Sequence, residues 1–234
     1  MLCVFATYYL MKHTIGTITI GQAPRTDVMP EIQPLLGSDI EVVEMGALDG
    51  LTRAEIETFA PQGDDYILHT RMCDGTSVTI AERHILPRMQ SCIDALTQQG
   101  VELVMLLCTG KFPTFRSTTL LIEPQKITDS IIGALAGKQH KIGIMTPLAG
   151  QIEQVTANLQ DLKNNVVAVS ASPYSAVDEI TPAAQRLGTE GVDVSVLHCI
   201  GYTMEMKGIV KETTGKPVIL ARALTARVVC ELLS

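Results

Sequence analysis

An internal repeat is the feature that most constrains how this chain of 234 residues can fold. The segment from Gly100 to Gly110 aligns without a gap on the segment from Gly191 to Gly201. Each segment contains an acidic residue, an apolar run and the motif Cys-x-Gly. A short apolar run between glycines is typical of a strand that is buried on both faces. The repeat therefore predicts two related units, each built around a buried parallel sheet.

A second pair of segments supports the first. His13–Thr19 resembles His140–Thr146, and each reads as a short strand followed by a polar turn that contains a proline, Pro24 or Pro147. Predicted strands and helices alternate along the rest of the chain, which favours parallel sheets with helices on both faces. We therefore expect an α/β fold of two pseudo-symmetric Rossmann-like lobes that face each other across a cleft.

The first lobe carries extra chain between its repeated strands. Two β-like runs flank Asp74-Gly75, which is a strong hairpin signal, so we expect a β-hairpin insertion near residues 66–80. The expected units are a first lobe of residues 11–110 and 215–234 and a second lobe of residues 111–214.

Composition excludes several classes of protein. The formal charge of −7 argues against nucleic-acid binding, which normally needs a basic patch. No apolar run reaches the roughly 20 residues of a membrane span, so no membrane partner is expected. The apolar leader, residues 1–10, lacks the basic start and the cleavage site of a secretory signal. We interpret the leader as non-native or disordered, and we expect a cytoplasmic protein.

The repeat divides the six cysteines into two groups. No two of them have the Cys-x-x-Cys spacing of zinc or redox motifs, and we expect neither a metal site nor disulfides. Cys3, Cys73, Cys92 and Cys230 have no counterpart in the repeat, and we interpret the last three as packing residues. Cys108 and Cys199 end matching strands, and the glycine after each allows backbone N–H groups to face an anion.

The paired cysteines suggest proton transfer. Ligands of parallel sheets bind at the carboxyl ends of strands, so the two sulfurs are expected at one functional edge. One thiolate and one thiol on opposite sides of a substrate can remove a proton from one face of a carbon and deliver it to the other. We expect Cys108 and Cys199 to be catalytic and His198 to point away from the Cys199 sulfur.

Several residues that follow the strands are candidates for binding a carboxylate. Arg25 can pair with a carboxylate through two hydrogen bonds, and the alternative is that it is a surface residue at the start of a helix. The same two interpretations apply to Gln22. Hydroxyl groups are further candidates, although Ser and Thr before Pro also cap helices. The expected substrate-binding residues are Gln22, Arg25, Thr109, Gly110, Thr146, Ser172, Ile200 and Gly201.

These motifs resemble known families. The two Cys-x-Gly motifs on repeated α/β lobes resemble the aspartate/glutamate racemase superfamily. The match to the AroM protein family of bacteria is closer and covers nearly the whole chain from Met11 onward. It rests on the runs Ile15–Arg25, Thr70–Gly75 and Cys199–Tyr202.

The resemblance implies a mechanism but no substrate. Superfamily members typically work without metal or pyridoxal phosphate and use paired cysteines, or one cysteine, as acid, base or nucleophile. By matching position, Cys108 and Cys199 take these roles, and a homodimer is implied. The AroM family is linked to the shikimate pathway by gene neighbourhood. Amino-acid racemases commonly have Asn-Thr and Thr-Glu after their cysteines, whereas this chain has Thr-Gly and Ile-Gly-Tyr, which argues against a free amino acid as substrate.

We therefore expect a cofactor-independent racemase- or isomerase-like enzyme that acts on a small carboxylate. Two alternatives stay open. One is a lyase or cis–trans isomerase that uses a single cysteine. The other is a non-catalytic metabolite-binding protein linked to aromatic amino-acid metabolism.

Overall fold

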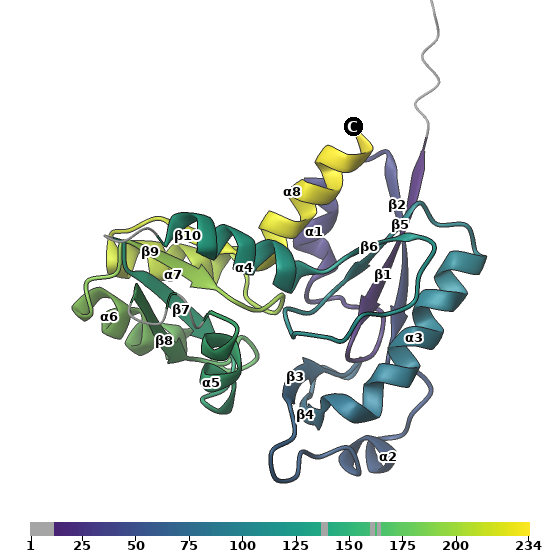
Figure 1. Ribbon diagram of the computed structural model, residues 1–234, viewed down its shortest axis with the longest axis horizontal. Helices are drawn as coiled ribbons and strands as arrows, with labels where there is room; N and C mark the ends of the chain where they lie inside the picture. The colour runs from purple at the N-terminus through teal and green to yellow at the C-terminus, as the bar shows by residue number, and fades with distance from the viewer. Residues whose placement is uncertain (1–11, 137–139, 160–161, 163–164) are drawn as a thin grey trace, which may run out of the picture.

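The chain folds into two lobes, each built on a four-stranded parallel sheet with helices packed beside it (Figure 1). A computed structural model describes residues 12–136, 140–159, 162 and 165–234. The predicted α/β fold with two parallel sheets is confirmed. The interpretation of the leader, residues 1–10, falls outside the described residues.

The first sheet has the strand order β2-β1-β5-β6, and all its strands are parallel. Three helices belong to this lobe, and a capping box at Thr52 and Glu55 begins the second of them. The elements are β1 (His13–Thr19), α1 (Met29–Leu36), β2 (Ile40–Gly46), α2 (Arg53–Glu57), α3 (Glu82–Gln98), β5 (Leu103–Leu106) and β6 (Leu120–Ile122).

The second sheet has the order β10-β9-β7-β8 and is also parallel. Read in reverse, as β8-β7-β9-β10, this order matches that of the first sheet strand by strand, with β7 in the place of β1 and β9 in the place of β5. The elements are α4 (Pro124–Leu135), β7 (Ile142–Thr146), α5 (Gly150–Ala157), β8 (Val166–Ser170), a 3-10 turn (Val177–Glu179), α6 (Ile180–Thr189), β9 (Val194–Leu197), α7 (Met204–Thr214), β10 (Val218–Leu220) and α8 (Ala221–Leu233).

The repeat extends to how the helices pack. Gly16 of β1 and Gly143 of β7 each face a leucine from a covering helix, Leu96 and Leu187 respectively. A Cβ at either glycine would lie 2.7 Å or 3.0 Å from the nearest leucine methyl carbon. The missing side chain therefore lets the helix approach the central strand of each sheet.

The outermost strands differ from the expected lobe boundaries. The sequence predicts that 111–214 belongs to the second lobe, but β6 pairs with β5 in the first sheet. The sequence predicts that 215–234 belongs to the first lobe, but β10 pairs with β9 in the second sheet. Three-residue strands are too short to show periodicity, and the chain changes lobe after them, at α4 and α8. Helix α8 itself packs in the first lobe, where Val229 joins the cluster around Ile15.

The extra chain of the first lobe forms a hairpin at the expected place. Strands β3 (Ile67–Arg71) and β4 (Ser77–Ala81) pair antiparallel as a separate two-stranded sheet. Gly75 has a φ of +84°, which a glycine adopts without strain. The Thr76 N–H donates to Asp74 Oδ1 at 2.8 Å. The hairpin lies on the side of the first sheet that faces α5 (Figure 1).

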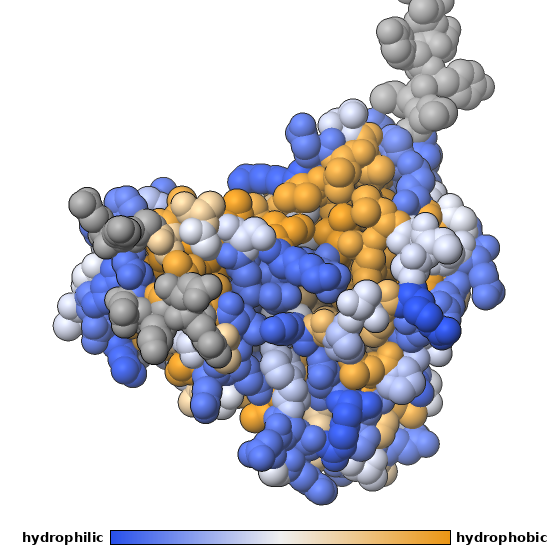
Figure 2. Space-filling model, in the orientation of Figure 1, coloured by the Kyte–Doolittle hydropathy of each residue, from blue (hydrophilic) through white to orange (hydrophobic). Residues whose placement is uncertain are grey.

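The surface is not uniformly polar. Figure 2 shows an apolar area over α8 and the neighbouring part of the first lobe. Exposed large apolar side chains include Leu232 of α8 and Leu120 of β6. Among the described residues, each helix is too short or too polar to span a bilayer.

Candidate active site

The two repeated cysteines occupy the same local turn. Cys108 follows β5 and Cys199 follows β9, each two residues beyond the end of its strand. The Gly110 N–H donates to Cys108 Sγ at 3.2 Å, and the Gly201 N–H donates to Cys199 Sγ at 3.3 Å. We expected these N–H groups to face a bound anion, but they point at the sulfurs. In this position each N–H stabilises the negative charge of the thiolate and so lowers the pKa of the thiol.

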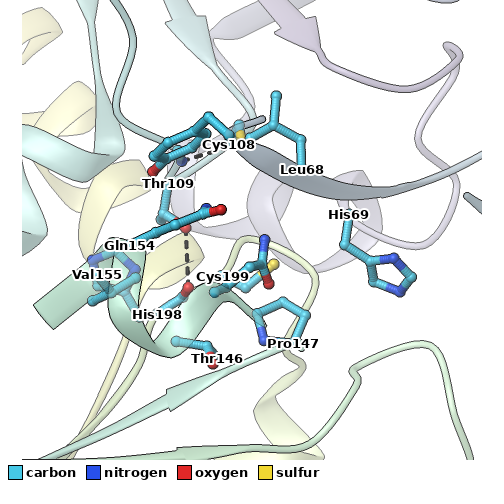
Figure 3. A pocket seen from close by; sticks show the side chains of 13 residues that line it. Leu68, His69, Cys108, Thr109, Thr146, Pro147, Gln154, Val155, His198 and Cys199 are labelled. Carbon is cyan, nitrogen blue, oxygen red and sulfur yellow. Dashed lines mark hydrogen bonds between the residues drawn. The ribbon is translucent and has the colours of Figure 1, made fainter. Parts of the chain in front are cut away.

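The two turns meet between the lobes. Thr109 Oγ1 donates to the carbonyl oxygen of His198 at 3.0 Å, so the residue after one cysteine bonds the residue before the other. Both cysteines line one cavity of about 30 Å³ (Figure 3), which has room for one or two water molecules. The other lining residues are Tyr66, Leu68, His69, Thr109, Gly110, Thr146, Pro147, Gln151, Gln154, Val155 and His198.

The cavity brings together only part of the predicted site. Thr109, Gly110 and Thr146 join the cysteines in its wall. His198 contributes to the wall as well, but its ring turns away from the Cys199 sulfur (Figure 3) and its Nε2 lies 2.9 Å from Asp129 Oδ1. The predicted residues outside this wall are Gln22, Arg25, Ser172, Ile200 and Gly201.

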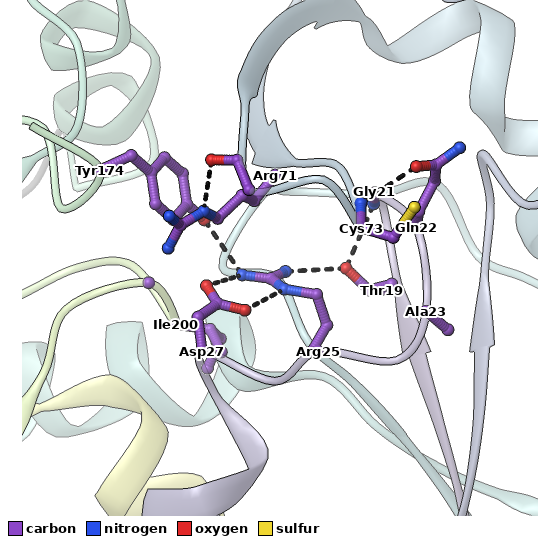
Figure 4. Close-up of polar contacts among 12 residues, drawn as sticks. Thr19, Gly21, Gln22, Ala23, Arg25, Asp27, Arg71, Cys73, Tyr174 and Ile200 are labelled. Carbon is purple, nitrogen blue, oxygen red and sulfur yellow. Dashed lines mark hydrogen bonds and ion pairs between the residues drawn. The ribbon is translucent and has the colours of Figure 1, made fainter. Parts of the chain in front are cut away.

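Gln22 holds two loops together (Figure 4). Its Nε2 donates to the carbonyl oxygens of Leu48 and Leu51, and its Oε1 accepts from the Cys73 N–H at 3.0 Å. Ser172 Oγ accepts from the Tyr174 N–H at 3.1 Å. Gln22 is therefore occupied by the protein's own backbone, and the Ser172 hydroxyl by the backbone and by His69 Nε2 at 3.5 Å.

Arg25 is buried, with 3% of its surface exposed. Its Nε and Nη2 each donate to the Asp27 carboxylate at 2.8 Å, and its Nη1 donates to Thr19 Oγ1 at 2.8 Å. Its Nη2 also donates to the Tyr174 hydroxyl at 3.3 Å (Figure 4). Burial would raise the pKa of Asp27, but the Arg25 guanidinium outweighs burial and lowers it. The guanidinium therefore pairs with Asp27 and does not line the cavity. Its positive charge still acts on the two cysteine thiols.

Burial dominates the chemistry of the two thiols. It raises the pKa of Cys108 to about 12, against the Gly110 N–H and the Arg25 charge, which lower it. Burial also raises the pKa of Cys199, against the Gly201 N–H and the charges of Arg25 and Arg222. Both thiols are therefore protonated at neutral pH in this structure, and admission of water to the sulfurs would lower both pKa values.

The hairpin forms part of the cavity wall, which the sequence did not indicate. Strand β3 and the residue before it supply Tyr66, Leu68 and His69. The Ile67 N–H donates to Gln154 Oε1 at 2.7 Å, and the Ile67 carbonyl accepts from Gln154 Nε2 at 3.0 Å and from Gln151 Nε2 at 3.2 Å. Asp74-Gly75 predicted a hairpin, but no local signal shows which surface a hairpin will contact.

Solved structures with the same fold include the aspartate racemase of Picrophilus torridus, with a TM-score of 0.62, 14% identity and 94% of each chain covered. Unliganded arylmalonate decarboxylase has a TM-score of 0.60 and 14% identity over 94% of this chain and 92% of that chain. The glutamate racemase of Aquifex pyrophilus has a TM-score of 0.55 and 12% identity, over 94% and 84%. At such identities the likeness shows the fold alone.

The sequence itself gives the family. No curated protein matches the chain. The AroM protein family matches residues 15–233, a span that contains both Cys-x-Gly turns, the hairpin and the buried Arg25. The chain therefore belongs to the AroM protein family, within the aspartate/glutamate racemase-like fold.

Proposed function

We propose that this protein is a cofactor-independent racemase or isomerase that moves a proton at the α-carbon of a small carboxylate. Cys108 and Cys199 are the proposed acid and base. The observation that carries the proposal is that the two sulfurs, each in the same Cys-x-Gly turn, line one cavity between the lobes. Thr109 and Thr146 supply hydroxyl groups in the same wall.

The proposed reaction conserves protons. One cysteine, as a thiolate, takes the α-proton, and the electron pair of the C–H bond moves into the carboxyl group. The other cysteine, as a thiol, gives its proton to the opposite face of the carbon. After the reaction the first cysteine is a thiol and the second is a thiolate. The cavity of about 30 Å³ is too small for such a substrate, so the lobes or the hairpin must open to admit it.

Deuterium exchange tests the two-cysteine reaction. Small carboxylic acids with an acidic α-proton are incubated with the protein in D₂O, and α-deuterium is measured by mass spectrometry. We expect exchange in the wild type and in Cys230→Ala, a cysteine outside the cavity. We expect none in Cys108→Ala or in Cys199→Ala. Exchange retained in either of the last two variants contradicts the two-cysteine mechanism.

The raised thiol pKa values also favour a second candidate, a one-cysteine decarboxylase. A thiol that stays protonated at neutral pH is ready to donate a proton to the carbanion that remains when carbon dioxide leaves. The thiolate formed is then reprotonated by water. Carbon dioxide release from 2-substituted malonates, abolished by one cysteine variant and retained by the other, would replace the first proposal with this one.

A further inference from the structure

A buried arginine lies behind the Cys199 turn. Arg222, in the first turn of α8, is 0% exposed. Its Nε donates to the Ile200 carbonyl and its Nη2 to the Gly201 carbonyl, both at 2.8 Å. Its Nη1 donates to Glu31 Oε2 at 3.0 Å. The guanidinium therefore holds the two peptide units on either side of Gly201, the residue whose N–H faces the Cys199 sulfur.

The Cys108 turn has no such arginine. Within the described part of the chain, no side chain donates to the carbonyl of Thr109 or of Gly110. The residue of α4 that corresponds to Arg222 is Gln125, because each is the second residue of the helix after the outermost strand. Gln125 donates to Asp129 instead. The two lobes therefore differ at this position, because a cation lies behind the Cys199 turn and a neutral amide takes the corresponding place in the other lobe.

The charged and titratable groups around the two sulfurs differ accordingly. The sulfur of Cys199 is influenced by two cations and one carboxylate, while the phenols of Tyr174 and Tyr202 also face it; the ions are Arg25, Arg222 and Asp27. The sulfur of Cys108 is influenced by the charge of Cys199 when that thiol is ionised, by the Arg25 cation and by the Glu82 carboxylate, with the phenol of Tyr66 beside it. Nearby cations favour the charged form of a thiol, and nearby anions disfavour it.

We propose that Arg222 is a positioning residue that holds the Cys199 turn and makes Cys199 the thiol that loses its proton first. Cys108 is then the proton donor of the resting protein. The assignment rests on the proposed two-cysteine function and gives its two sulfurs distinct starting roles. Once Cys199 has ionised, the protein is ready for the substrate enantiomer whose α-proton faces Cys199.

Thiol alkylation tests the assignment without a substrate. The full-length protein is treated with iodoacetamide between pH 6.5 and 12, and the peptides that contain Cys108 and Cys199 are quantified by mass spectrometry. The pH midpoint of each rate reports ionisation separately from access. We expect the midpoint of Cys199 to lie below that of Cys108. Cys108 reacting at the lower pH would overturn the proposal.

Charge variants test the role of Arg222. Arg222→Gln, which copies the residue of the other lobe, should raise the Cys199 midpoint by about one unit, a roughly tenfold loss of thiolate, and leave that of Cys108 nearly unchanged. Arg222→Lys keeps the charge and should restore most of the shift. Arg227→Gln removes an exposed cation from the same helix and should change neither midpoint. Equal shifts at both cysteines in Arg222→Gln would mean a general structural effect and contradict the assignment.

A second variant, which should shift the Cys199 midpoint in the opposite direction, tests the proposal if Arg222→Gln does not fold. Glu31→Gln leaves Arg222 in place but removes its carboxylate partner, so the Cys199 midpoint should fall. A rise would overturn the assignment. If the alkylation results agree but no carboxylate exchanges deuterium, the proposed function fails while the thiol order stands. If exchange occurs with Cys108 ionising first, only this inference fails.

Discussion

At the scale of single residues, burial and short hydrogen bonds set the chemistry of the cysteines. The sequence identified Cys108 and Cys199 because a repeat exposes matched positions. It did not show that Arg25 pairs with Asp27 or that Gln22 bonds the hairpin. Those partners follow from side-chain directions, which depend on the surrounding fold. Of the polar side chains predicted for the site, only Thr109 and Thr146 line the cavity, and Gln22 and Arg25 are satisfied by the protein itself.

The buried Cys108 thiol makes stability fall at alkaline pH. Its pKa is raised to about 12 by burial, whereas a thiol in the unfolded chain titrates near 8.5. Its stabilising contribution is present below the unfolded pKa and is lost as pH rises toward the folded one. Between pH 7.5 and 10.5, the wild type should lose more unfolding free energy than Cys108→Ala. Urea denaturation at both pH values measures this, and equal losses would show that the thiol is not desolvated.

At the scale of elements, the hairpin is the part that adds most to the site. A turn signal of two residues predicted it, and strands β3 and β4 form there. Its contact with α5 could not be predicted, because Gln151 and Gln154 carry no pattern that separates them from surface glutamines. Two amide side chains from the second lobe hold the backbone of Ile67. The hairpin is thus a part of the first lobe that contacts the second.

Removal of the amide contact should loosen the hairpin. Gln154→Ala deletes the two hydrogen bonds that Gln154 makes to Ile67 and leaves the one from Gln151, and each net hydrogen bond contributes about 1 kcal/mol. We expect amide exchange of Ile67 to accelerate about tenfold or more and alkylation of both cavity cysteines to become faster. Glu153→Ala, on an exposed position of the same helix, is the control. Unchanged exchange in Gln154→Ala would show that other contacts hold the hairpin closed.

At the scale of the whole molecule, two crossings of the chain join the lobes. Each crossing follows an outermost strand and continues as a helix, α4 or α8. Helix α8 leaves the second sheet, places Arg222 behind Cys199 and packs Val229 in the core of the first lobe. The position of one cysteine therefore depends on a helix that packs on the other lobe.

A cavity under α8 should weaken both lobes. Val229 is 0% exposed, and removal of its two methyl groups costs about 2 kcal/mol by transfer and cavity terms. Val229→Ala should lower the urea midpoint of unfolding. The decrease should be the same whether it is measured by tyrosine fluorescence or by labelling of Cys92 in the first lobe. Arg227→Ala, exposed on the same helix, should leave the midpoint unchanged. Two separate midpoints would show that the lobes unfold independently.

The sequence by itself determined the two-lobe α/β architecture, the matched cysteine turns and the hairpin. These features have local or periodic signals, since glycines, apolar runs and Asp-Gly turns act on their neighbours in the chain. Only the tertiary structure decided which strands join which sheet, where the hairpin docks and which cysteine has Arg222 behind it. These depend on contacts between residues far apart in sequence, such as Arg222 with Gly201 and Glu31. A repeat shows that two sites are alike, but the packing around them makes the sites different.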